Sequence, residues 1–206
     1  DALFRLDRSQ LQSQLNRLVK AKSSLSARAA RLEAERDGKK ELIFPDAIAA
    51  TIDAEIVAIA AEQTNDFLSG LNRHQTELAI LDQRVRALEE SITGVTAQKK
   101  AAEDQLAIVE EEIVRKKGLL DKGLTDRSQF AALMRNQAEL LGQTGAAASE
   151  IARAKTQIVE SRQQTERAIT QRVEQASKDL TEVRRQEADY DEQIFAARAL
   201  LDRTVV

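Results

Sequence analysis

The stretch Arg115–Phe130, RKKGLLDKGLTDRSQF, decides the fold because it interrupts two long helical repeats. It holds two of the chain's seven glycines, Gly118 and Gly123. Gly123 can adopt the positive φ that ends a helix. Thr125 or Asp126 can cap the next helix by accepting hydrogen bonds from its free N–H groups. A short turn between two long apolar repeats predicts an antiparallel helical hairpin with this stretch at its tip.

The apolar residues on both sides of the tip recur with the alternating three- and four-residue spacing of a coiled coil. The first repeat, Leu71–Leu120, is unbroken over about seven heptads. The second repeat occupies Phe130–Thr165, slips by four residues and resumes over Ile169–Leu201, which we interpret as a stutter. Gly142, Gly145 and Ala146–Ala148 form a slender patch that another helix backbone could approach closely.

Composition also favours a long coiled coil over a globular domain. The 206 residues include no Trp, one Tyr, five Phe and one Pro, and the net charge is −3 with both signs interspersed. We expect no nucleic-acid partner, because no basic tract is interleaved with aromatic residues. The absence of Cys excludes disulfides and thiolate sites. The most apolar run, Ala47–Ala61, is too short to span a membrane and contains two acidic residues.

The lengths of the repeats predict the arrangement of the helices. We predict helices at about 8–37, 46–121 and 126–202, with a linker at 38–45 and the tip at 122–126. The second and third helices have nearly equal lengths, so they form the hairpin. The first helix, with Lys22 as the one charged residue on its apolar seam, makes a three-helix bundle with the hairpin base. An alternative breaks the second helix at Asn65–Gly70 and makes Asp46–Thr64 a separate segment.

The two ends of the chain differ from the helical domain, which we place at 7–202. Residues 2–6 alternate apolar and polar side chains like a short strand, and the last three residues could form another. We therefore assign 1–6 and 203–206 to remnants of an interrupted β-domain and expect the chain to be a piece of a larger protein.

Three stretches carry a resemblance to a known family: LFRLD at 3–7, LLDKGLTDRSQF at 119–130 and ALLDRTVV at 199–206. In order and spacing they resemble the α-hairpin region of periplasmic adaptor proteins, the membrane fusion proteins of the HlyD family. ARLEAERDG at 30–38 and IFP at 43–45 are similar to the type I secretion branch, which serves exporters of proteases and lipases. The resemblance implies that the hairpin interrupts a lipoyl-like domain.

The resemblance also implies partners and a location. The hairpin tip would contact a TolC-like outer-membrane channel, and an inner-membrane ABC transporter would lie at the other end of the protein. Copies of the protein would form a ring, with six the implied number. The full-length protein would be anchored in the inner membrane of a Gram-negative bacterium by segments absent here, with this region in the periplasm.

The family's tip signature is an Arg, a Leu four residues later and a Ser or Thr seven residues further on. Arg115 and Leu119 match the first two positions, whereas Asp126 occupies the third and Thr125 lies beside it. Either residue could supply the third contact. Leu124 lies in the turn itself. We therefore predict a partner-binding tip made of Arg115, Leu119, Gly123, Leu124, Thr125 and Asp126.

We expect no enzymatic activity, cofactor or metal. The sequence contains no nucleophile elbow, phosphate loop or base–nucleophile pair, and its one histidine, His74, lies on the apolar seam. Two other functions remain open. One is an intracellular antiparallel coiled-coil arm or scaffold, and the other is a drug-efflux adaptor of the same superfamily.

Overall fold

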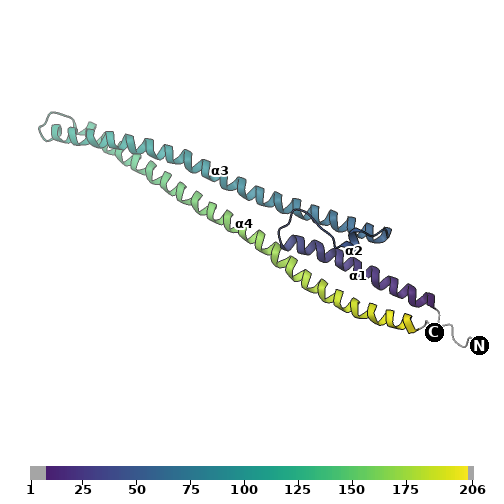
Figure 1. Ribbon diagram of the computed structural model, residues 1–206. Helices are drawn as coiled ribbons and strands as arrows, with labels where there is room; N and C mark the ends of the chain where they lie inside the picture. Colours follow the sequence, from purple (N-terminus) through teal and green to yellow (C-terminus); the bar gives the residue numbers. More distant parts are fainter. Residues whose placement is uncertain (1–7, 204–206) are drawn as a thin grey trace, which may run out of the picture. The chain divides into compact units, whose positions relative to one another are not determined.

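The computed structural model describes residues 8–203, and within that range every secondary-structure element is an α-helix. The helices are α1 (Arg8–Arg36), α2 (Asp46–Ala49), α3 (Ala54–Leu120) and α4 (Arg127–Arg203) (Figure 1). α3 and α4 are the arms of a long helical hairpin, which confirms the predicted all-α hairpin fold. The predicted strand remnants at 1–6 and 204–206 lie outside the described residues. Arg203, assigned to the second remnant, is instead the last residue of α4.

The chain divides into two compact units, and both long helices contribute to each of them. The first unit contains residues 1–77 and 167–206, and the second contains residues 78–166.

In the first unit, α1 lies between α4 and the segment that leads into α3 (Figure 1). The face of α1 toward α4 is apolar at two levels. One cluster joins Ala29 and Leu32 to Leu180 and Val183, and the other joins Leu15 to Ile194 and Ala197. A third cluster joins Ala27, on another side of α1, to Ile48 of α2 and Ile56 of α3.

Polar pairs separate the two clusters between α1 and α4. Lys22, the charged residue on the apolar seam of α1, pairs with Asp191, and the Ser26 hydroxyl donates a hydrogen bond to Glu187. Arg184 pairs with Glu33 further along the contact. These polar partners face each other in only one register of the two helices. The pairs therefore oppose a shift of α1 along α4 by one heptad.

The helix predicted at 46–121 is wrong at its start, because it is interrupted after one turn. α2 ends at Ala49, and α3 begins at Ala54. Thr51 and Ile52 are β-branched, which disfavours helix, and the Asp53 carboxylate accepts a hydrogen bond from the Glu55 N–H at 2.9 Å. Asp53 therefore caps a new helix.

The alternative break at Asn65–Gly70 is also wrong, because α3 continues through it. Phe67, in the middle of that range, is among the most completely buried side chains of the chain. Burial of a phenylalanine side chain stabilises by roughly 1.5–3 kcal/mol, which exceeds the cost of about 1 kcal/mol for Gly70 in a helix.

In the second unit, α3 and α4 pack directly on each other. Ala102 and Val109 of α3 form a buried cluster with Leu140 of α4, and Leu106 and Ile113 pack against it. All five residues belong to the predicted apolar seams.

Candidate partner-binding site at the hairpin tip

The tip turn is built by hydrogen bonds that end α3 abruptly. The Leu124 N–H donates to the Leu119 carbonyl and the Gly123 N–H to the Leu120 carbonyl, both at 2.9 Å. This pair of bonds is the Schellman motif, which needs a left-handed residue at the position of Gly123. Gly123 has a φ of 71°, as its sequence position predicts. The motif fixes Leu124 over the last turn of α3, where Leu119 lies.

Asp126, not Thr125, caps α4. The Ser128 N–H donates to the Asp126 carboxylate at 3.1 Å, whereas the Thr125 hydroxyl bonds the Gln129 side chain at 3.4 Å. The negative charge of Asp126 also lies at the positive end of the α4 dipole. The cap employs one carboxylate oxygen, so the other remains available to a partner.

The apolar side chains of the tip are exposed. Leu119 is 41% exposed and Leu124 is 70% exposed, while Leu120, on the apolar seam, is half-buried. Hydrophobic side chains left in water at the end of a hairpin are available to a partner, because the fold itself gains little from them. Leu119 and Leu124 come from the two sides of one turn and together form a small apolar cap.

Basic residues surround this apolar cap. Residues 115–127 contain five basic and two acidic side chains. Arg115 makes only a long contact with Glu111, at 3.9 Å on the solvent-exposed surface, so its guanidinium remains free to bond a partner. Lys116 instead holds the turn, donating to Gln129 at 2.9 Å. Lys117, Lys122 and Arg127 complete this basic set. The predicted tip did not include them, although their charges are visible in the sequence.

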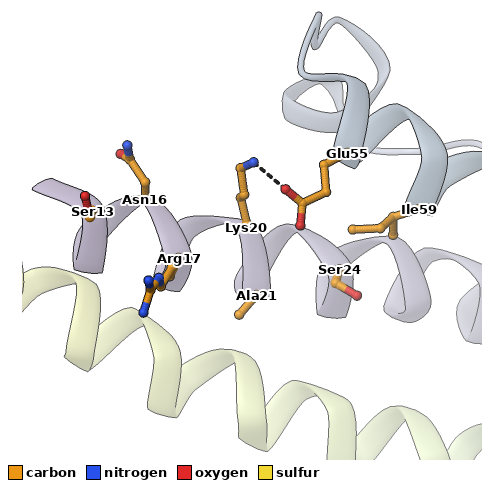
Figure 2. Close-up of a pocket in the computed structure, with 8 residues that line it drawn as sticks. All are labelled: Ser13, Asn16, Arg17, Lys20, Ala21, Ser24, Glu55 and Ile59. Carbon is orange, nitrogen blue, oxygen red and sulfur yellow. Dashed lines mark hydrogen bonds and ion pairs between the residues drawn. The ribbon is translucent and has the colours of Figure 1, made fainter.

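A second candidate, in the first unit, is a shallow hollow between α1 and the start of α3 (Figure 2). Arg17 and Lys20 are its cations, and Lys20 reaches the Glu55 carboxylate and lies 3.4 Å from Asp53. The hydrogen bond to Glu55 raises the pKa of Lys20, and the bond from the Glu55 N–H lowers the pKa of Asp53. Lys20 is thus paired with acidic residues at the start of α3, and these pairs brace the two helices.

No three acidic or histidine side chains within residues 8–203 are grouped to hold a metal ion. None of the helices in that range is long and apolar enough to cross a membrane. The tip can therefore provide apolar contact, hydrogen bonds and positive charge.

A family profile described as AprE, long alpha-helical hairpin, matches residues 11–200, and the chain belongs to that family. Among the relatives, the type I secretion system membrane fusion protein PrsE of Rhizobium meliloti (strain 1021) is 30% identical over 208 residues. That alignment covers 98% of this chain and 46% of PrsE, so the chain spans about half the length of this curated relative. The predicted resemblance to membrane fusion proteins of type I secretion is confirmed.

The fold also matches a solved structure, the soluble domain of LipC, which its authors describe as a membrane fusion protein of a type I secretion system. The TM-score is 0.92, and the alignment covers 98% of this chain and 96% of LipC at 21% identity. At that identity, the match establishes the helical hairpin fold.

Proposed function

We propose that this chain is the periplasmic hairpin of an adaptor that bridges an inner-membrane ABC transporter and a TolC-like outer-membrane channel in type I secretion. The similarity to PrsE along 98% of the chain carries this proposal. The exported substrate passes through the assembly, and the hairpin contributes contacts with no bond-making chemistry. In this proposal the full-length protein is anchored in the inner membrane, and copies of it form a ring, with six the expected number.

The tip is the surface proposed to contact the channel. Leu119 and Leu124 would bury apolar area there, and Arg115 would bond carbonyl or carboxylate oxygens of the channel. Gly123 fixes the turn, Asp126 caps α4, and Thr125 or Asp126 would supply the third polar contact. The exposure of both leucines supports this assignment.

At the other end of the domain, we propose that α1 makes a three-helix bundle with α3 and α4. Its contacts with α4 in two clusters and with α3 in one support this arrangement. The domain would then join a lipoyl-like β-domain through the residues at both chain ends. α1 would stiffen the part of the hairpin that lies farthest from its tip.

The proposal is tested with acidic substitutions in the full-length protein, measured by substrate secretion and by thermal unfolding of the purified protein. Leu119→Asp and Leu124→Asp should each abolish secretion and change the unfolding temperature little, because both side chains are exposed. Leu120→Asp should lower the unfolding temperature, because it places a charge on the seam between α3 and α4.

Val114→Asp is the matched control. Val114 is 72% exposed, also on α3, but lies before the turn. It should secrete normally and unfold at the parental temperature. Normal secretion by both Leu119→Asp and Leu124→Asp would refute tip docking, as would equal loss of secretion in Val114→Asp.

A further inference from the structure

In the second unit, α4 carries two apolar seams side by side. The inner seam packs on α3 and includes Leu140, which is buried. The residues one position after each inner-seam residue together form an outer seam that runs from Ala131 to Val159 and is interrupted by Lys155. Its large members are Met134, Leu141 and Val159, and all of its members are exposed. Leu140 is 4% exposed, whereas Leu141 is 51% exposed. A helix with two adjacent apolar seams is patterned to pack between two neighbours.

α3 has an outer seam too, on every seventh residue. It consists of Ile80, Ala87, Gly94, Ala101 and Ile108, each one position before an inner-seam residue. All five are exposed, and Ile108 is 63% exposed. The fold within one chain therefore leaves an apolar stripe on each arm without a partner.

The two outer seams lie on opposite flanks of the helix pair. Glu89 and Arg162 each follow an inner-seam residue, and their side chains form an ion pair at 3.1 Å across the two helices. Residues that follow the inner seam of either helix therefore share one flank. The outer-seam residues of α4 each come one position after an inner-seam residue, so they lie on that flank. The outer-seam residues of α3 each come one position before an inner-seam residue, so they lie on the opposite flank.

We propose that the outer seam of α4 in one copy packs against the outer seam of α3 in a second copy of this chain. The inference rests on the proposed function, in which copies of the adaptor assemble. Because the two surfaces differ, the contact is heterologous. It leaves the α3 outer seam of the first copy and the α4 outer seam of the second copy free for further copies. Repetition of a heterologous contact generates a ring when the rotation closes.

The small residues of both seams permit a close approach of the two helices. A Cβ atom added at Gly94 or Gly145 would meet nothing within 4 Å, so both backbones are open to a neighbour. Helix axes come as close as about 8 Å where the contact residues are small. At that spacing Ile108 and Leu141 can reach across and bury their side chains against the neighbouring helix.

Charge complementarity favours a second copy as the occupant. In copies related by rotation about an axis parallel to the hairpin, equivalent residues lie at the same height along that axis. The hydrogen bond from Gln137 to Glu110, at 3.3 Å, shows which residues of α4 and α3 share a height. Arg135 then faces Glu111 and Glu112 of the neighbour. Lys155 lies within a helical turn of the level of Glu90.

Within residues 8–203, Arg135 and Lys155 have no ion-pair partner, and Glu90 and Glu112 have none either. The cations therefore lie beside the α4 seam and unpaired acids beside the α3 seam. Surface ion pairs contribute little affinity, but they discriminate between registers of two otherwise similar apolar stripes.

Cysteine cross-linking tests the contact, because this stretch of the protein has no cysteine of its own. The double variant Ala101→Cys/Gly145→Cys is placed in the full-length protein, with any other cysteines replaced, and oxidised in membranes. A disulfide needs Cα atoms within about 7 Å, and the two positions lie on opposite flanks of one hairpin. The expected product is therefore a ladder of cross-linked multimers.

The single variants Ala101→Cys and Gly145→Cys are the matched controls and should stay uncross-linked, since a heterologous contact never brings a residue to its own copy. Adding Arg135→Glu should reduce the ladder several-fold, and adding Glu111→Arg and Glu112→Arg to that variant should restore it. Absence of the ladder, or dimers formed by the single variants, would overturn the proposal. If the ladder is absent while Leu119→Asp still abolishes secretion, this interface is rejected and docking of the tip on the channel stands.

Discussion

Gly118 and Gly123 lie five residues apart at the hairpin tip, and replacing each of them by alanine should change the stability of the tip in opposite directions. An added Cβ would meet no atom within 4 Å at either position, so steric clash contributes nothing. Gly123 has a φ of 71°, where alanine is strained by about 1–2 kcal/mol. Alanine also restricts the unfolded chain, which returns about 0.4–1 kcal/mol. Gly123→Ala should therefore destabilise the tip by about 1 kcal/mol.

Gly118 is helical, and Gly118→Ala should stabilise the same region by about 0.8–1 kcal/mol. Hydrogen exchange at the amides of residues 117–130 measures both effects, because local opening of the tip exposes them together. A change of 1 kcal/mol alters the exchange rate about five-fold, so the two variants should differ by more than ten-fold. Gly123→Ala should also reduce secretion, since the Schellman bonds position Leu124, whereas Gly118→Ala should not. Shifts of the two exchange rates in the same direction would refute the account of the turn.

Two further predictions concern the first unit. Leu180→Ala should destabilise the protein by about 2–5 kcal/mol in chemical denaturation, because Leu180 is buried against α1, while Leu200→Ala, on the same helix but half exposed, should cost under about 1 kcal/mol. A small effect of Leu180→Ala would show that α1 does not depend on that cluster. The hydrogen bond from Arg185, with a second from Gln186, lowers the pKa of Glu182 to about 2. Its contribution to stability should be full above the ordinary pKa of 4.5 and should be lost progressively as pH falls from there to about 2. NMR titration should show Arg185→Ala returning this pKa toward the ordinary value.

The sequence predicted the tip and the hairpin well because both depend on local rules. Gly123 was assigned by its freedom to adopt positive φ, and the inner seams by a spacing that one helix pair can satisfy. The alternative at the cap, Thr125 or Asp126, required coordinates, because both residue types cap helices and only their positions relative to Ser128 distinguish them.

The start of α3 was not predictable by the same rules. Residues 46–61 contain β-branched residues inside both helices, at Ile48, Ile56, Val57 and Ile59, as well as between them, so helix propensity alone does not mark the break. The periodicity gives no reason for one there either. What separates α2 from α3 is tertiary: Ile48 and Ile56 pack together against Ala27 of α1, and a break lets both reach it. The predicted continuity through residues 65–70 is correct, and the alternative break at Asn65–Gly70 does not form because Phe67 is buried there. Long-range packing decided both cases.

α4 shows how the same helix serves different neighbours in the two units. Its apolar seam packs on α3 at Leu140 and on α1 at Leu180 and Ile194, and the stutter after Thr165 lies between these regions. The residues one position after each seam residue change from mostly apolar to mostly polar at the same place.

From 131 to 159 that position is apolar or small apart from Lys155, whereas from 170 to 202 it is polar apart from Ala188 and Phe195. Where α1 is present, it already packs on α4. Where only two helices pack together, α4 retains an exposed apolar seam. This restriction to the two-helix region is what a contact between copies requires, because a second copy can supply there the neighbour that α1 supplies elsewhere.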